Sequence, residues 1–365
     1  MKRPIVRLSS LQLTNIKNVK NGTIYMPNTV NKILSADKAE ILGIYGQNGS
    51  GKTAIVDALY FLQKVMVGAD LDQSLEDYMT IDSDTAEIFA DFNIFMDGIV
   101  FEIGYTLSLS REEKEIVINR EILRSAKNEN GIRTNKTTFM DYQRDQTDVI
   151  FKPQKRLDEI LEANKEIKTD LIVARKMAEK SNCSYIFGES SREIFCREYK
   201  NGFQQFSVII SSLFEFALKD LFVIRNTHSG VISANFVLPM AFRIENDNIG
   251  AKGDFAVPLT EPILVDEERK NLLETIVEQI NIVLYTIIPG LQVTIKNYGK
   301  QSLDNGEEGW KLELMSKREG MKEIPIRMES EGIIKIISIL NALIQAFGNP
   351  YFQKECKRTI ALYFP

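Results

Sequence analysis

Apolar residues in the first part of the chain alternate in short runs and then change to a helical period. Residues 5–13, IVRLSSLQL, and 22–26, GTIYM, have the alternation of short strands, and the polar TNIKNVKNG between them is turn-prone. Residues 40–45, EILGIY, form a compact apolar run that favours a buried central strand. In KTAIVDALYFLQKVMVG, which begins at Lys52, apolar residues recur at helical spacing until Gly68. The pattern therefore predicts a strand, a glycine-rich loop and a helix in succession.

Strand-like alternation returns after this helix. Residues 86–123 have the pattern of a meander of antiparallel strands with a hairpin turn at Asp97-Gly98, and we expect this sheet to form a lobe beside the core. Residues 125–150 are polar and predict an exposed loop. Residues 153–180 have a helical stripe of leucine and isoleucine against a charged remainder. That helix either packs on the domain as an ordinary amphipathic helix or protrudes as an arm that meets a partner.

The last third of the chain predicts a helix, a hairpin and a second helix. Residues 266–288 form an amphipathic pattern that Pro289-Gly290 ends. Residues 291–299 and 309–317 then have the alternation of a β-hairpin. Beyond this hairpin, ESEGIIKIISIL predicts a helix whose apolar residues lie mostly on one face.

The glycine-rich loop has the pattern G-x-x-x-x-G-K-T, from Gly46 to Thr53. A strand before it and a helix after it are the context that a phosphate-binding loop requires. Its glycines allow backbone N–H groups to converge on a β-phosphate at the positive end of the following helix. Lys52 would bridge the β- and γ-phosphates of ATP, which makes it the candidate catalytic residue, and the Thr53 hydroxyl would coordinate Mg²⁺. The residues that we expect to bind nucleotide are Gly46, Gln47, Asn48, Gly49, Ser50, Gly51, Lys52 and Thr53.

Phosphoryl transfer also needs a second carboxylate that holds Mg²⁺ and a group that orients the attacking water. The usual source is a buried strand that ends in Asp-Glu, and only PILVDEER is similar, with Asp266, Glu267 and Glu268. These acids run straight into a helix, where the helix dipole favours them without any catalytic role. We therefore interpret them as residues that cap the helix.

Ser330 and Gly332 form a second candidate anion site. They lie in ESEG, directly before the last apolar helix, and a Ser-x-Gly turn at a helix N-terminus presents N–H groups and a hydroxyl to an anion. Alternatively, Ser330 is a plain N-cap, with Glu329 and Glu331 complementing the helix dipole. The phosphate-loop pattern upstream shifts the balance toward the anion site.

Charge and composition narrow the function classes. Lys and Arg number 45 against 50 Asp and Glu, so the net charge is −5. This balance argues against a surface built for indiscriminate nucleic-acid binding, although it permits a local basic groove. The single histidine, His228, excludes His-rich metal sites and disfavours a Ser-His-Asp hydrolase. We expect it to be a loop imidazole near the surface rather than part of a site.

Cysteine content and hydropathy predict the cellular compartment of the protein. Cys183, Cys196 and Cys356 are widely spaced and odd in number, so neither a disulfide framework nor a zinc site fits them. No apolar run reaches the ~20 residues of a bilayer span, and the N-terminus lacks the apolar core of a signal peptide. We expect a soluble, cytoplasmic protein with no membrane partner.

Three segments together resemble the ABC-type ATPases of the RecF/SMC group, and more closely the AAA/OLD-like ATPases of bacterial anti-phage defence loci. LQLTNIKNVKNGTI resembles the family's first strand and its N-F-K turn, here Asn15-Ile16-Lys17. GIYGQNGSGKTAIVDAL has the family's G-x-N-G-x-G-K-T form, and ESEGIIKIISIL resembles a degenerate ABC signature. The resemblance implies an α/β fold: a P-loop NTPase core of the ABC-ATPase type with an antiparallel β lobe and an inserted helical region.

The resemblance also implies that three parts of the chain have different roles. Residues 1–150 would be an N-terminal ATPase half with the phosphate loop and the β lobe, 151–255 a helical insertion, and 256–365 a C-terminal ATPase half. In such proteins two subunits enclose two ATP molecules, so Ser330 and Gly332 would contact the γ-phosphate held by the other subunit. ATP would hold the homodimer closed, hydrolysis would release it, and the motion would pass to DNA or to a partner effector such as a nuclease.

Two alternatives to this switch remain open. A RecF-like DNA-repair clamp would bind duplex DNA with an affinity that falls steeply with salt, and the acidic balance of the chain leans against it. A non-hydrolysing ATP-binding scaffold would use its helical region to recruit the effector. The long insertion between Lys52 and Ser330 disfavours a transporter ATPase.

The chain departs from the family's pattern after the signature-like helix. The family has an apolar strand there that ends in Asp-Glu, followed by a switch histidine. This chain instead reads GNPYFQKECKRTIALYFP, in which TIALYF has the apolar character of that strand but contains no acids. A shortened polypeptide, a gene interrupted late and a degenerate subunit would each explain the difference.

We therefore predict that this 365-residue polypeptide binds ATP but hydrolyses it slowly or not at all. The reason is that it lacks the glutamate that activates water and the second Mg²⁺ carboxylate. Measuring phosphate release with Mg²⁺ and ATP checks this, with a Lys52→Ala preparation as the background. Robust turnover that Lys52→Ala abolishes would contradict the prediction.

Overall fold

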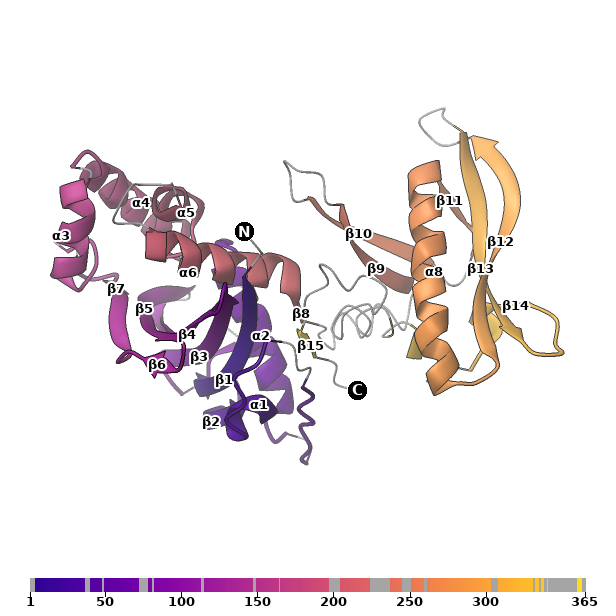
Figure 1. The fold of residues 1–365 in the computed structure, drawn as a ribbon, viewed down its shortest axis with the longest axis horizontal. Coiled ribbons are helices and arrows are strands. Elements are labelled where there is room, and N and C mark those ends of the chain that lie inside the picture. Colours follow the sequence, from indigo (N-terminus) through magenta and orange to yellow (C-terminus); the bar gives the residue numbers. More distant parts are fainter. Residues whose placement is uncertain are drawn as a thin grey trace. The chain divides into compact units, whose positions relative to one another are not determined.

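A computed structural model of the chain divides it into two units, Met1–Leu221 and Phe222–Pro365, each of which is described by itself (Figure 1). The structure describes residues 4–36, 40–47, 49–71, 78–80, 82–112, 115–146, 149–163, 165–196, 204–223, 237–244, 251–258, 261–302, 308–330, 332–334, 336–337, 340 and 360–362. Of the residues named above, those outside these ranges are Asn48, His228, Glu331 and Cys356. The three-part organisation of the chain stays a prediction.

The first unit is built on a seven-stranded antiparallel sheet with the order β2-β1-β3-β4-β5-β6, and β7 also pairs with β5. Its strands are β1 Ile5–Ile16, β2 Val19–Tyr25, β3 Thr85–Met96, β4 Ile99–Glu112, β5 Glu115–Glu129, β6 Ile132–Arg133 and β7 Thr137–Gln143. Every second residue of β3 from Ala86 to Ile94 is buried, so the sheet presents one apolar face. Asp97 and Gly98 join β3 to β4 with φ of 46° and 83°, the left-handed pair that a tight hairpin turn requires, and the predicted meander is confirmed.

Strand β7 shows that the predicted exposed loop over 125–150 is wrong. β5 continues to Glu129, and β7 pairs along it. Phe139 and Tyr142 of β7 are buried, and the Phe139 ring centroid lies 4.1 Å from that of Phe206. Only a few apolar residues are needed here, because a neighbouring strand takes the backbone groups and alternate side chains can face solvent.

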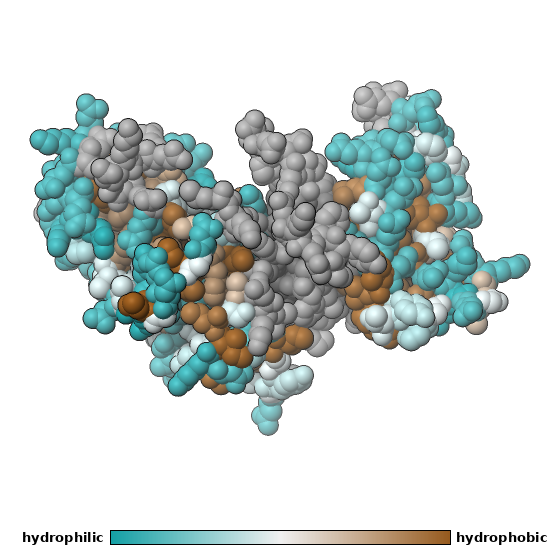
Figure 2. Space-filling view, viewed as in Figure 1, coloured by the Kyte–Doolittle hydropathy of each residue, from teal (hydrophilic) through white to brown (hydrophobic). Residues whose placement is uncertain are grey.

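Helices pack on the sheet of the first unit, and α2 and α6 both contact β1. The helices are α1 Pro27–Val30, α2 Lys52–Met66, α3 Gln154–Ala163, α4 Ile167–Ser181, α5 Glu189–Cys196, α6 Gln204–Glu215 and the π-helix η2 Phe216–Asp220. The single helix predicted over 153–180 is two helices, since the step from Leu161 to Ile167 in its apolar stripe is too long for one helical face. Its stripe residues Leu157 and Leu171 are buried, which confirms the packed amphipathic interpretation. Hydrophilic residues predominate over α3 on the face shown in Figure 2.

A buried carboxylate joins the sheet of the first unit to the segment before α5. Glu121 on β5 is fully buried and accepts hydrogen bonds from the Tyr105 hydroxyl at 2.6 Å, the Ser184 hydroxyl at 2.6 Å and the Tyr185 N–H at 2.7 Å. Burial raises the pKa of Glu121, and the hydrogen bonds from Ser184 and Tyr105 oppose that rise. Three donors from distant segments therefore depend on one acceptor.

From the unit boundary onward, the elements form three small sheets: β11-β13-β12 with β14 on β13, β10-β9, and β15-β8. They are β8 Leu221–Val223, β9 Val237–Ile244, β10 Ala251–Pro258, β11 Ile263–Val265, α8 Glu267–Ile287, β12 Leu291–Ser302, β13 Glu308–Arg318, β14 Ile324–Pro325, the 3₁₀-helix η3 Ile326–Met328 and β15 Ile360–Leu362. Leu273 and Ile280 of α8 share an apolar core with Leu312 and Leu314 of β13. The predicted helix and hairpin are confirmed, and β15 lies within TIALYF.

Asp266 begins α8 as a helix cap. Its Oδ1 accepts the N–H of Arg269 at 2.8 Å, and Glu267 and Glu268 occupy the first turn. The capping interpretation of these acids is confirmed. Cys183 and Cys196 are both free thiols. Among the helices in the described ranges, none combines the length and the apolar character that crossing a bilayer demands.

We predict that Glu121→Ala destabilises the protein by at least about 2 kcal/mol, because each buried donor left without an acceptor costs roughly 1–3 kcal/mol. Urea unfolding followed by circular dichroism measures the change. Glu129→Ala is the control at the exposed end of the same strand, where the ion pair with Lys127 contributes little. Equal unfolding midpoints for the two variants would contradict the prediction.

Candidate functional site

The glycine-rich loop leads into α2, whose N-terminus is open to an anion. Gly51 precedes the helix with φ 90°, and no side chain caps the first turn. That turn also contains no acidic residue, so no carboxylate of its own competes with a bound anion for the positive end of the helix dipole. The N–H groups at this end can therefore converge on a phosphate.

Two glycines of the loop have no room for a side chain. A Cβ at Gly46 would lie 2.7 Å from Ser50 Oγ, and a Cβ at Gly51 would lie 2.5 Å from Val19 Cγ2. Gly49 has space around it but adopts φ 84°, which residues with a side chain rarely do. Space therefore favours glycine at Gly46 and Gly51, and backbone conformation favours it at Gly49 and Gly51.

Lys52, the first residue of α2, lies over the phosphate loop. Its Nζ donates to the carbonyl oxygens of Gly46 and Gln47, at 2.8 Å in both cases. The Ser50 N–H donates to the Gln47 carbonyl at 3.1 Å and closes the loop. A lysine held in this way can exchange backbone carbonyls for phosphate oxygens with little movement. Thr53 is exposed in the first turn of α2, where its hydroxyl is accessible to a metal ion.

The buried central strand predicted over 40–45 is wrong. Residues 40–47 have no regular secondary structure, and Ile41 and Tyr45 are 74% and 94% exposed. A strand requires a neighbouring strand that takes its N–H and C=O groups. Within the described ranges, no strand pairs with this segment.

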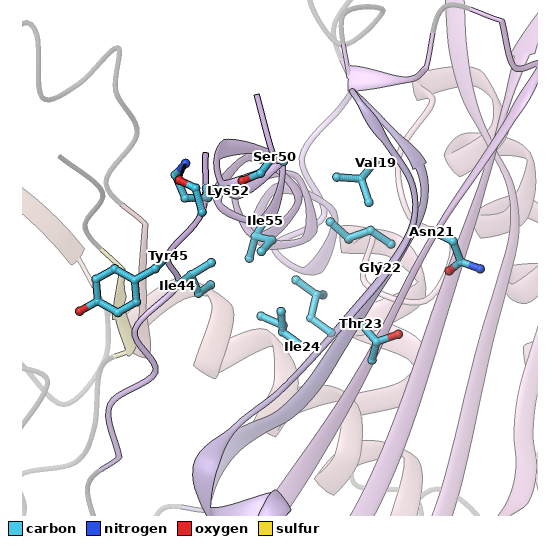
Figure 3. A pocket seen from close by; sticks show the side chains of 14 residues that line it. Val19, Asn21, Gly22, Thr23, Ile24, Ile44, Tyr45, Ser50, Lys52 and Ile55 are labelled. Atoms are coloured by element: carbon cyan, nitrogen blue, oxygen red, sulfur yellow. Dashed lines mark hydrogen bonds between the residues drawn. The ribbon is translucent and has the colours of Figure 1, made fainter. Parts of the chain in front are cut away.

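A pocket of about 310 Å³ lies between this segment, the loop and the β1–β2 hairpin. It is lined by Leu11, Leu13, Val19, Asn21, Gly22, Thr23, Ile24, Ile44, Tyr45, Gly46, Ser50, Gly51, Lys52 and Ile55. Figure 3 shows Ile44 and Ile55 close together beside the loop, whereas the Tyr45 ring points away from the strands. The lining is therefore mostly apolar, with polar side chains that include Asn21, Thr23, Ser50 and Lys52.

Ser330 and Gly332 lie together at the start of a helix in the second unit. Ser330 is exposed, its carbonyl accepts the N–H of Ile334 at 3.1 Å, and its Oγ lies 3.5 Å from the N–H of Ile333. Ser330 therefore has N-cap geometry with a long, weak side-chain bond. The predicted turn is present, and its role toward an anion stays a prediction.

Two charged clamps hold the residues before Ser330 against β13. The Glu329 carboxylate accepts from Ser316 Oγ at 2.5 Å and from Arg318 Nη2 at 2.9 Å. Arg327 donates to Glu313, which also accepts from the Tyr298 hydroxyl at 2.6 Å. Glu329 therefore binds β13 through its carboxylate, whereas the sequence-based alternative assigned it only to the helix dipole.

Both clamp carboxylates have lowered pKa values. Burial by itself would raise the pKa of Glu313, but the hydrogen bonds from Tyr298 and Arg327 outweigh it. At Glu329, burial likewise raises the pKa, and the bonds from Ser316 and Arg318 hold it below its usual range. Both groups therefore stabilise the fold in their ionised form.

No cluster of three or more His, Cys, Asp or Glu side chains suited to a metal ion occurs in the part of the chain that the structure describes. A bound Mg²⁺ at the loop would take its ligands from Thr53 and from the nucleotide's own phosphates, which is the common arrangement for this ion. The exposed hydroxyl at the first turn fits that role.

Residues 41–169 match a family model described as "AAA domain, putative AbiEii toxin, Type IV TA system". This match confirms the resemblance to an AAA-type P-loop ATPase, a class whose phosphate loop implies nucleotide binding. No significant match was found among curated proteins.

Solved structures similar to this chain include the recombination mediator protein RecF bound to ATP, with a TM-score of 0.35 and 10% identity over 98% of this chain and 85% of that one. Another is the Smc head domain with an extended coiled coil, bound to the C-terminal domain of ScpA, derived from Pyrococcus furiosus. Its TM-score is 0.33, with 15% identity over 93% of this chain and 78% of that one.

The contacts by which the β1–β2 turn supports the loop were not predicted from the sequence, which placed Lys17 only in the N-F-K-like turn of the resemblance. Asn18 Nδ2 donates to the Gly49 carbonyl, and Lys17 forms an ion pair with Asp57 of α2. One signal was available: Asp57 is a lone carboxylate on a helix face that is otherwise apolar. Because a buried carboxylate requires a partner, it indicated a cation close by.

We predict that Glu329→Gln lowers the stability of the second unit by about 1–3 kcal/mol at neutral pH, the usual contribution of a hydrogen bond to a charged group. A carboxyl whose pKa is lower in the folded state stabilises above its unfolded pKa, and this stability is lost as pH falls through the folded pKa. The loss on mutation should therefore shrink below about pH 4.5. Trp310, the single tryptophan, reports urea unfolding of this unit at each pH.

The control for this prediction is Glu308→Gln, which removes an exposed carboxylate that pairs with Lys300 on the same hairpin. It should leave the midpoint almost unchanged at neutral pH. A Glu329→Gln effect that stays constant down to acid pH would show that the ionised form is not what stabilises the clamp.

Proposed function

We propose that this chain binds ATP with Mg²⁺ at Gly46–Thr53 and acts as an ATP-gated switch. The observation that carries the proposal is the open N-terminus of α2, which combines close-packed glycines, no acid in the first turn and Lys52 bound to loop carbonyls. Each of these features favours a polyphosphate over a neutral ligand. The match of residues 41–169 to an AAA domain supports the same assignment.

The second half of the ATP site would come from another copy of the chain. Ser330 exposes its hydroxyl at the start of a helix, and the clamps from Glu329 and Arg327 to β13 hold that turn in one position. A preorganised hydroxyl and N–H turn can bind the γ-phosphate that Lys52 holds in the first copy. ATP would then favour the closed homodimer because its γ-phosphate contacts both subunits.

The cellular role that we propose is a bacterial anti-phage defence or DNA-maintenance system, in which the switch controls a partner effector such as a nuclease. The family model that residues 41–169 match supports this class, because it describes a putative toxin of a type IV toxin–antitoxin system. A RecF-like DNA clamp and a non-hydrolysing scaffold are the competing functions. The switch would change its assembly with nucleotide alone. The clamp would need DNA for such a change, and the scaffold would bind nucleotide without any change of assembly.

Calorimetry with a non-hydrolysable ATP analogue and Mg²⁺, followed by light scattering, tests this function. Lys52→Ala should weaken nucleotide binding by about 10- to 100-fold, which corresponds to losing charge-assisted hydrogen bonds to phosphate. Ser330→Arg should keep nucleotide binding by the monomer but abolish the nucleotide-dependent doubling of mass. Gln301→Arg adds the same charge at another exposed position of the second unit and should dimerise normally.

A Ser330→Arg protein that dimerises with nucleotide as the unmodified chain does would contradict the shared site. Adding duplex DNA separates the competing functions. A mass increase that requires DNA and disappears with salt would favour the clamp. Nucleotide binding without any change of mass would favour the scaffold.

A further inference from the structure

The turn between β1 and β2 supports the phosphate loop from one side. Asn18 Nδ2 donates to the Gly49 carbonyl. Val19, the first residue of β2, occupies the space that a side chain at Gly51 would need. A shift of this turn would therefore move or release the loop at two points.

The backbone of the turn is held by a short segment after α2. Lys17 has φ 51°, a left-handed conformation that residues with a side chain disfavour. Its N–H donates to the Tyr78 carbonyl at 2.8 Å, and its own carbonyl accepts from Thr80 Oγ1 at 2.7 Å. These bonds fix the turn's conformation, and the Tyr78 ring lies beside Phe61 of α2, with the ring centroids 6.1 Å apart.

A charged contact also connects the turn to α2: the ion pair between Lys17 and Asp57. Asp57 lies one helical turn beyond Thr53, on the same side of the helix, and its side chain is 4% exposed. The Lys17 side chain is 31% exposed, and its Nζ lies 5.2 Å from the centre of the Tyr78 ring. An ionised carboxylate at this depth is stable only with a charged or hydrogen-bonding partner, so the pair holds the turn against the helix.

We propose that the Lys17–Asp57 ion pair is the positioning element of the phosphate loop: it sets the distance between the β1–β2 turn and α2, and thereby the shape of the loop between them. Neither residue contacts the nucleotide in this role. The inference rests on the proposed function, since it concerns the same ATP site. It predicts that nucleotide affinity depends on a carboxylate that lies beneath the site.

The competing role for Lys17 is a direct contact with phosphate. The two roles differ in how mutations combine. If Lys17 acts only through Asp57, removing both partners should weaken binding no more than removing one. If Lys17 contacts phosphate by itself, the effects of Lys17→Met and Asp57→Asn should multiply.

The experiment measures the Kd for ATP with Mg²⁺ by calorimetry, at a temperature where circular dichroism shows each variant folded. Asp57→Asn and Lys17→Met should each weaken binding by about 10- to 100-fold, because a displaced loop loses charge-assisted hydrogen bonds to phosphate. The Kd of the double variant should equal that of the single variant that binds ATP more weakly. Lys17→Arg should recover most of the affinity. Lys20→Met, an exposed lysine on the same hairpin, is the matched control and should bind as the unmodified chain does.

Unchanged affinity in a folded Asp57→Asn protein, with only a lower unfolding temperature, would make the pair merely structural and overturn the inference. Multiplying effects would overturn it in favour of a direct contact. In both cases Lys52→Ala would still weaken nucleotide binding, so the proposed function would stand. If the unmodified chain bound no nucleotide, the proposed function and this inference would fall together. Should Asp57→Asn not fold, Asp57→Glu, which keeps the charge but lengthens the side chain, takes its place in the comparison with Lys17→Met and the double variant.

Discussion

The contact between Val19 of the β1–β2 hairpin and Gly51 leaves no space for a side chain at Gly51, and it places the hairpin directly against the phosphate loop. A phosphate loop needs rigid support, because its N–H groups must all point to one place before the ligand arrives. In the described residues this support does not come from a strand before the loop, since residues 40–47 pair with no strand. It comes from the β1–β2 hairpin, whose turn contacts the loop and, through Lys17, the helix behind it.

In the second unit a β-hairpin also holds a turn that precedes a helix, but here the contacts are charged. Ser330 also lies in a short turn before a helix, and a β-hairpin again holds that turn in place. Here the contacts are charged clamps, from Glu329 to Ser316 and Arg318 and from Arg327 to Glu313. Each carboxylate combines an arginine with a hydroxyl donor, so its burial is compensated and its charge retained. Both candidate half-sites are thus helix N-termini that a neighbouring hairpin makes rigid.

Periodicity predicted the elements that bury one continuous face. The helix after the loop, the meander of β3 to β5, helix α8 and the β12–β13 hairpin all have clear apolar repeats, and all were confirmed. The strand predictions failed where the apolar pattern of a segment did not agree with the strand pairing that the described residues show. EILGIY has the composition of a buried strand but pairs with no strand in the part of the chain that the structure describes, whereas TTFMDYQ is polar by composition and becomes a strand because β5 pairs with it. A strand is a property of a pair of segments, so a single segment cannot specify it.

The sequence by itself determined which residues are candidates to bind a phosphate: the glycines of the loop, Lys52, Thr53 and the turn at Ser330. These assignments are local, since they depend on residue types within a few positions of a helix start. Only the tertiary structure decided what holds those atoms in place. Lys17 lies 40 positions from Asp57, and Glu329 lies 11 from Arg318, so neither pairing follows from a local pattern. The register of the strands and the packing of the helices bring these charges together, because a buried charge is stable only where a partner reaches it.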